Sequence, residues 1–156
     1  MPKHFYSSYK IRMEKIRLEE QAIPFDCPEK IKDFWREYIL KESWYTESQE
    51  IMVVFHLNTK NKVTGHHLVS IGTLNSTLAH PRDVFRTAIL NNSASIIAVH
   101  NHPSGDTTPS DADIKITREL ARAGKLLKID VLDSIIVDNE GENYRSLREM
   151  GYLYDH

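Results

Sequence analysis

The chain has 156 residues, with 20 basic and 22 acidic side chains and a formal net charge of −2. This length suits one domain with a single core, and 40% hydrophobic with 27% charged residues is typical of a globular protein. No apolar run approaches about 18 residues, which excludes a membrane-spanning helix, and the polar start predicts no signal peptide. The lone cysteine, Cys27, excludes an internal disulfide and a cysteine-based zinc site, so we expect a cytoplasmic protein.

The first third of the chain predicts one strand and one helix. Tyr9 to Leu18 alternates loosely between apolar and polar residues, as an edge strand does. Pro28 suits the first turn of a helix, and apolar residues then recur at helical spacing, namely Ile31, Phe34, Trp35, Tyr38 and Ile39. We therefore expect residues 1–48 to form an N-terminal extension of a main domain over residues 49–156.

The main domain mixes strands and helices. Its predicted elements are a buried strand Ile51–Leu57, a returning strand Val63–Leu74, a helix from Pro81, a short strand Ser95–His100, a helix from Ser110 to about Ala123 with Gly124 near its end, and strands over Lys128–Asp138 and Tyr144–Leu147. This order predicts an α/β or α+β domain in which helices flank a mixed central β-sheet in three layers.

The residues that follow the short buried strand can hold a divalent metal ion. His100 and His102 are two residues apart at the strand end, so both imidazoles point to one side. Asp113 shares a helix face with Thr117 and Leu120 and therefore turns towards the sheet. An inward carboxylate needs a partner, which a metal ion held by both histidines supplies. Two histidines and one carboxylate, with water in the fourth position, are a ligand set of catalytic zinc.

Hydrolysis at such a site also needs a base and a group that stabilises the oxyanion. Ser110 lies one helical turn before Asp113, so its hydroxyl could reach an oxygen bound to the metal. Glu50 begins the central strand and could lie over the metal as the base, if that strand pairs with the one ending at His100. Two alternatives stay open: Ser110 and Asp113 can form a capping box, and Glu50 can be a solvated acid at a strand end.

Three further histidines lie in the predicted hairpin. His56, inside the central strand, fits a hydrogen-bonded core residue better than a metal ligand. His66 and His67 are adjacent and point to opposite faces of a strand, so both cannot easily join one site, and we expect them at the surface.

The spacing His-x-His, seven residues and Ser-x-x-Asp resembles the JAMM/MPN metalloproteases, whose domain is also called JAB. The string from His100 to Asp106 resembles the RadC branch of bacterial JAB proteins, with supporting matches at Thr73-Leu74, at His80 to Phe85 and at Leu132-Asp133. The resemblance extends over Glu50 to Leu153 and implies a cytidine-deaminase-like three-layer domain. It also implies that Zn²⁺ is bound by His100, His102 and Asp113, with Ser110 beside the zinc-bound water and Glu50 as the base.

This resemblance implies a zinc-dependent hydrolase of peptide or isopeptide bonds, acting on a protein or peptide substrate. The chain departs from the family pattern at Ser134, where relatives have histidine, and residues 1–48 are too short for the helical DNA-binding region of long RadC proteins. A DNA-repair-associated or nuclease-like accessory protein and a non-catalytic module stapled by zinc therefore stay open. The basic residues of the second helix fit a solvated face, with phosphate contact as the alternative: Lys115, Arg118, Arg122, Lys125 and Lys128.

Overall fold

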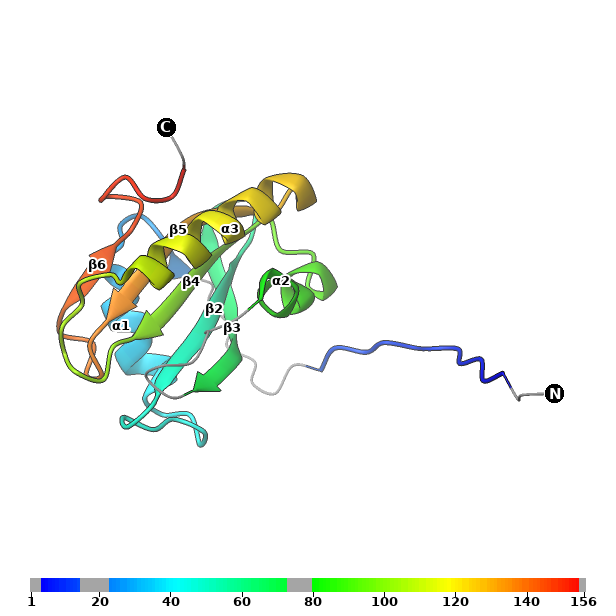
Figure 1. Ribbon diagram of the computed structural model, residues 1–156, viewed down its shortest axis with the longest axis horizontal. Helices are drawn as coiled ribbons and strands as arrows, with labels where there is room; N and C mark the ends of the chain where they lie inside the picture. Colours follow the sequence, from blue (N-terminus) through cyan, green and yellow to red (C-terminus); the bar gives the residue numbers. More distant parts are fainter. Residues whose placement is uncertain (1–3, 15–22, 73–79, 155–156) are drawn as a thin grey trace.

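The computed structural model describes residues 4–14, 23–72 and 80–154. Within these residues, six strands form one sheet in the order β1-β3-β2-β4-β5-β6 (Figure 1). Strands β4 and β5 are parallel and the other neighbouring pairs are antiparallel, so the sheet is mixed. The strands are β1 Ile23–Pro24, β2 Glu50–Leu57, β3 Lys62–Gly72, β4 Ser95–Asn101, β5 Asp130–Val137 and β6 Tyr144–Ser146.

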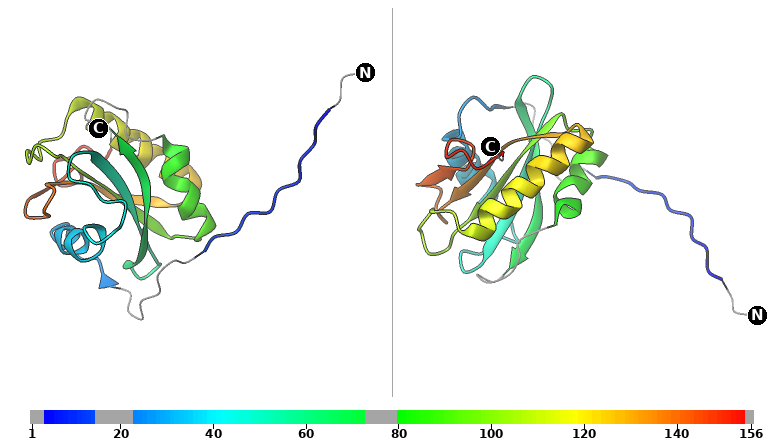
Figure 2. Two further views of the ribbon diagram at one scale, coloured as in Figure 1. Left: turned by 90° about the horizontal axis from the view of Figure 1, so that it is seen from below. Right: turned by 45° about the horizontal axis from the view of Figure 1, so that its top comes forward.

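Helices cover both faces of this sheet and give three layers (Figures 1 and 2). On one face lie α1 (Lys30–Phe34) and the π-helix η1 (Trp35–Ile39), and on the other lie α2 (Pro81–Leu90) and α3 (Asp111–Leu127). The expected mixed α/β class is confirmed, and the arrangement agrees with a JAB/MPN-type domain. No helix in the described ranges combines the length and apolar content needed to cross a membrane.

Alternation along β2 separates two hydrophobic cores. Val53 and Phe55 pack under α1 and η1, whereas Met52 and Val54 pack under α2 and α3. Both faces of β2 are therefore buried, which explains its nearly continuous apolar sequence. Because side chains two residues apart share a face, Glu50 belongs to the α3 side of the sheet.

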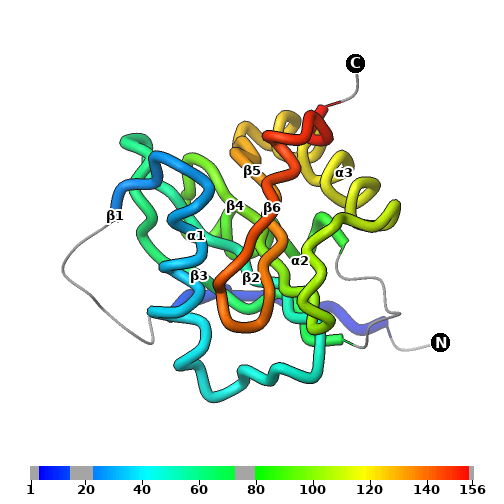
Figure 3. Tube along the Cα trace, turned by 90° about the vertical axis from the view of Figure 1, so that its left-hand side faces the viewer, coloured from blue at the N-terminus to red at the C-terminus, as the bar shows by residue number. Residues whose placement is uncertain are grey.

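The N-terminal helix shares a core with the sheet. Trp35 and Ile39 are fully buried in the cluster that contains Phe55. In Figure 3, α1 lies beside the turn between β5 and β6, where Arg36 Nη1 donates a hydrogen bond of 2.8 Å to the Gly141 carbonyl. The division of the chain at residue 48 stays a prediction.

Several element ends differ from those expected. Residues 9–14 are exposed and lie in no strand, while residues 15–18 of that expected strand and residues 73–74 of the returning strand lie outside the described residues. The last helix runs to Leu127 and ends at Lys128 in the left-handed region, with φ 61°. Gly124 lies inside this helix. A larger residue would not fit there, because an added Cβ would be 2.5 Å from the backbone oxygen of Ile129. The glycine serves close packing and does not terminate the helix.

Candidate metal centre

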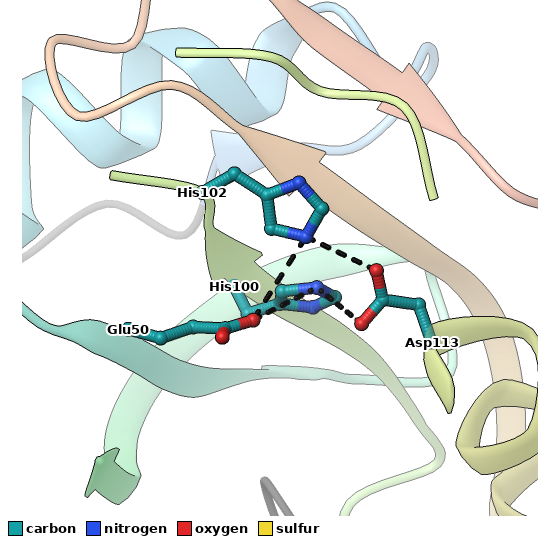
Figure 4. Close-up of side chains that lie close together, drawn as sticks. All are labelled: Glu50, His100, His102 and Asp113. Atoms are coloured by element: carbon teal, nitrogen blue, oxygen red, sulfur yellow. Dashed lines mark hydrogen bonds and ion pairs between the residues drawn. The ribbon is translucent and has the colours of Figure 1, made fainter. Parts of the chain in front are cut away.

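Four side chains from neighbouring elements meet at one end of the sheet (Figure 4). Glu50 begins β2, His100 lies near the end of β4, His102 follows β4, and Asp113 belongs to the first turn of α3. One potential ligand atom from each residue lies within 4.8 Å of the others. Glu50 and Asp113 approach the imidazoles from opposite sides in Figure 4. The structure thus brings together four of the five residues that the sequence analysis placed at the site.

The Asp113 carboxylate lies closer to the two imidazoles than the Glu50 carboxylate does. Asp113 Oδ1 is 3.2 Å from His100 Nε2, and Asp113 Oδ2 is 3.0 Å from His102 Nε2. Glu50 Oε1 is 3.6 Å and 3.9 Å from the same two nitrogens. In a tetrahedral site with ligand atoms about 2.0–2.1 Å from zinc, neighbouring ligand atoms are about 3.3 Å apart. The two distances from Asp113, each to a different carboxylate oxygen, are close to this spacing, and those from Glu50 are slightly longer.

Both imidazoles turn their Nε2 atoms to the Asp113 carboxylate. His100 is fully buried, and neither of its ring nitrogens has an aligned hydrogen-bond partner among the described residues, which is costly; a metal ion would satisfy Nε2. The Nδ1 of His102 donates a hydrogen bond of 2.8 Å to the Asp106 carbonyl, and its Nε2 is hydrogen-bonded to Asp113 Oδ2 at 3.0 Å, so Nε2 is the nitrogen that would bind a metal. The donor set therefore fits a divalent metal ion.

Ser110 is the N-cap of α3 and forms a capping box with Asp113. Its Oγ accepts a hydrogen bond of 3.1 Å from the Asp113 amide, and its own amide donates one of 2.9 Å to Asp113 Oδ2. The capping alternative is thus confirmed, and the box also orients the Asp113 carboxylate. A role for the Ser110 hydroxyl beside the oxyanion stays a prediction.

The environment moves the pKa values of the two carboxyl groups in opposite directions. Burial raises the pKa of Glu50, although the imidazoles of His100 and His102 act to lower it. Burial also acts to raise the pKa of Asp113, but the close approach of the His100 and His102 imidazoles outweighs burial and holds that pKa well below its usual range. Asp113 therefore stays ionised, as a ligand must, and Glu50 is better suited to accept a proton.

A second histidine pair lies near the other end of β2. Ser93 Oγ and His56 Nδ1 share a hydrogen bond of 2.7 Å, and Asn91 Nδ2 donates one of 3.1 Å to the same oxygen. His56 Nε2 and His67 Nδ1 share one of 2.9 Å. The expected core position of His56 is confirmed, whereas His66 and His67 are partly buried and not fully exposed as predicted. The two side chains do lie on opposite faces of the sheet: the His66 ring packs against Phe55 on the α1 side, whereas His67 bonds His56 on the other.

Two other positions complete the comparison with the sequence analysis. Ser134, at the place of the family histidine, is buried and accepts a hydrogen bond of 2.9 Å from Thr117 Oγ1, so it has a structural partner. Asn101 was not singled out, although it is fully buried and lies between the two histidines. A polar residue between two candidate ligands, at the end of an apolar strand, is the sequence feature that could have indicated a role for Asn101 near the site.

Sequence comparisons define the class of protein to which this fold and cluster belong. The RadC-like JAB domain family matches residues 25–152, so the chain belongs to this family. A UPF0758 protein of Chlorobium chlorochromatii is 51% identical over 107 residues, which cover 69% of this chain and 47% of that protein. A UPF0758 protein of Geobacillus thermodenitrificans is 43% identical over 127 residues, covering 81% of this chain and 53% of that protein. The chain thus spans about half the length of these relatives, which establish the family and leave the reaction to be proposed.

Proposed function

We propose that the chain is a zinc-dependent hydrolase that cleaves a peptide or isopeptide amide bond. The observation that carries this proposal is the convergence of two imidazoles and an ionised carboxylate, with a second carboxylate of raised pKa beside them. Membership of the RadC-like JAB family supports it. His100, His102 and Asp113 would hold the zinc, which acts as a Lewis acid and lowers the pKa of water to about 7.

The remaining residues of the site have distinct tasks in this reaction. Glu50 takes a proton from the attacking water as its oxygen joins the carbonyl carbon, and delivers a proton to the nitrogen as the C–N bond breaks. The Ser110 oxygen accepts a hydrogen bond from the Asp113 amide, which leaves the hydroxyl proton free to donate. That proton is directed to the carbonyl oxygen as negative charge develops there.

The test of this proposal is the separation of zinc binding from turnover at Glu50. Zinc-loaded wild type is assayed against pools of capped peptides and isopeptide-linked peptides, beside Glu50→Gln and the control Glu47→Gln, which changes an exposed acid nearby. We expect Glu50→Gln to keep its zinc and to lose about 10²–10⁴-fold in kcat, the usual contribution of a general base. Unchanged kcat in Glu50→Gln would contradict the assigned role, and the control is expected to match wild type.

A non-catalytic zinc module is supported by one feature, the inclusion of Glu50 within 4.8 Å of the other donors. Structural zinc sites have four protein ligands, and Glu50 could be the fourth. In that case Glu50→Gln would weaken zinc binding strongly, whereas the hydrolase proposal predicts near-wild-type zinc affinity. Zinc titration of the two proteins in competition with a chelator distinguishes the two functions.

A DNA-associated function is supported by a basic groove between α3 and the C-terminal segment. The groove has a volume of about 510 Å³, and Lys115, Arg118 and Arg122 line it together with Asp111 and Tyr152. Arg118 lies over the Tyr152 ring at 5.9 Å. This function predicts duplex binding with steep salt dependence. No duplex binding at low salt would remove it.

A further inference from the structure

The side chain of Asn101 holds the backbone on both sides of Glu50. Its Oδ1 accepts a hydrogen bond of 2.6 Å from the Ile51 amide, and its Nδ2 donates one of 3.1 Å to the Gln49 carbonyl. A side-chain amide offers an N–H donor and a C=O acceptor on one planar group, as a backbone peptide does. Asn101 therefore pairs with β2 in the manner of a strand.

This contact lies where backbone pairing between β2 and β4 ends. The last register pair of β2 with β4 is Met52 with His100, so Glu50 lies beyond that ladder, although it still pairs with Gly72 of β3 on its other side. The chain after Asn101 turns to the other neighbour, because the His102 amide donates a hydrogen bond of 2.9 Å to the Val137 carbonyl. On the β4 side of β2, the Asn101 side chain supplies the hydrogen bonds that the backbone ladder no longer provides beside Glu50.

Asn139 anchors this side chain. Asn101 Nδ2 donates a hydrogen bond of 2.7 Å to Asn139 Oδ1, and Asn139 Nδ2 donates one of 3.0 Å to the Glu47 carbonyl, just before β2. The Asn139 carbonyl accepts hydrogen bonds from Trp35 Nε1 at 3.2 Å and from the Tyr45 hydroxyl at 2.9 Å. The loop after β5, the N-terminal helical segment and the approach to β2 are thereby joined at one point.

We infer that Asn101 and Asn139 form a positioning unit that holds the Glu50 carboxylate beside the two imidazoles. Glu50 Oε1 is within 3.6–3.9 Å of both Nε2 atoms, and proton transfer falls steeply when a reacting group moves by about 1 Å. His102 and Asp113 have their own supports, in the Asp106 carbonyl and the capping box. The hydrogen bonds of Asn101 to β2 flank Glu50, so we expect the unit to position the base. Asn139 Nδ2 also donates a hydrogen bond of 3.4 Å to the Pro103 carbonyl, next to His102, so zinc content is the readout that separates an effect on the base from one on the ligands. This inference rests on the proposed function, because it takes Glu50 to be the proton-transfer group.

The first experiment needs no catalysis. Hydrogen exchange at the Ile51 amide is measured by NMR in wild type, Asn101→Ala and Asn58→Ala. Asn58 is a matched control, because its Oδ1 accepts hydrogen bonds from the Lys60 and Lys62 amides at the opposite end of β2. We expect exchange at Ile51 to accelerate at least tenfold in Asn101→Ala and to stay at the wild-type rate in Asn58→Ala. An unchanged rate in Asn101→Ala would overturn the inference whatever the activity.

The second experiment is a double-mutant cycle with zinc content measured in every protein. We expect Asn101→Ala to retain zinc, to lose about 10–100-fold in kcat with KM changed by less than about 3-fold, and to cause no further loss when Glu50→Gln is already present. Asn139→Asp keeps the acceptor for Asn101 and loses the donor to Glu47, so a smaller loss of kcat is expected.

Equal losses of kcat from Asn101→Ala in the wild-type and Glu50→Gln backgrounds would overturn the inference, since the residue would then act independently of Glu50. Loss of zinc from Asn101→Ala would overturn it too, by showing that the unit supports the ligands. Absence of turnover in zinc-loaded wild type would contradict the proposed function, and with it the catalytic part of the inference. In that case the exchange rate at Ile51 still decides whether Asn101 holds β2.

Discussion

The paired histidines His56 and His67 should make the protein sensitive to mild acid. Burial, and secondarily the neighbouring imidazoles, lower the pKa of His56 to about 3 and that of His67 to about 4, from an ordinary value of 6.5. At pH 8 both residues are neutral in the folded and the unfolded chain. As the pH falls below 6.5, the unfolded chain binds protons that the folded chain does not, so stability is lost down to the folded pKa values.

The size of this loss follows from the pKa difference. A pH of 5 lies one and a half units below the unfolded value, and each unit corresponds to about 1.4 kcal/mol, so each imidazole lowers the free energy of unfolding by about 2 kcal/mol. The pair together contributes about 4 kcal/mol, which is a large part of the roughly 5–15 kcal/mol of a typical domain.

Urea unfolding at pH 8 and pH 5 measures this contribution. The loss between the two pH values should be about 4 kcal/mol smaller in His56→Gln/His67→Gln than in wild type, and intermediate in His67→Gln alone. Because other titrating groups are common to all these proteins, their effect cancels in the difference. His4→Gln, in the exposed N-terminal segment, is the control and should behave as wild type. The same loss in the double variant as in wild type would refute a buried neutral pair.

Three further predictions concern the fold and its metal site. Gly124→Ala should lower the free energy of unfolding by about 1–2 kcal/mol in a urea titration, because the new Cβ meets Ile129 O at 2.5 Å and this overpacking exceeds the gain in helix propensity. The control Gly65→Ala, with open space around the new Cβ, should stay within about 0.5 kcal/mol of wild type. Ser110→Ala should cost about 1 kcal/mol as a lost N-cap, whereas Ser110→Thr should recover most of it; equal stability of the two would show that the hydroxyl cap contributes little. Zinc at 100 times its dissociation constant should raise stability by about 2.7 kcal/mol over the chelator-treated protein in thermal unfolding, and no shift would mean that zinc does not bind the folded chain selectively.

The grouping of His100, His102 and Asp113 could be predicted because its geometry is local. The i, i+2 relation places His100 and His102 on one side, and the helical period turns Asp113 towards the sheet. The position of Glu50 depended on which strands pair, and the antiparallel pairing of β2 with β4 now provides it. The nearly continuous apolar run of β2, the helical spacing of apolar residues in α1 and the proline that begins α2 likewise located these elements, since each signal lies within or next to the element it marks.

The features that escaped prediction depend on contacts distant in the sequence or on small backbone changes. Asn101 and Asn139 are hydrogen-bonded across 38 positions, and nothing in either local sequence indicates the other. The helical spacing around Trp35 predicted a helix, but not the widened π-turn in which the Leu40 amide donates to the Trp35 carbonyl. Glycine near a helix end is typical of a helix terminator, but Gly124 lies inside α3, where close packing against Ile129 leaves no room for a side chain.

The most direct test of the account is zinc stoichiometry in purified wild type, His100→Ala, Asp113→Ala and Glu50→Gln. Metal analysis after gel filtration should find close to one zinc per chain in wild type and Glu50→Gln, and almost none in His100→Ala or Asp113→Ala. Equal zinc in all four proteins, or its loss in Glu50→Gln alone, would contradict a site built from His100, His102 and Asp113 with Glu50 outside the ligand set.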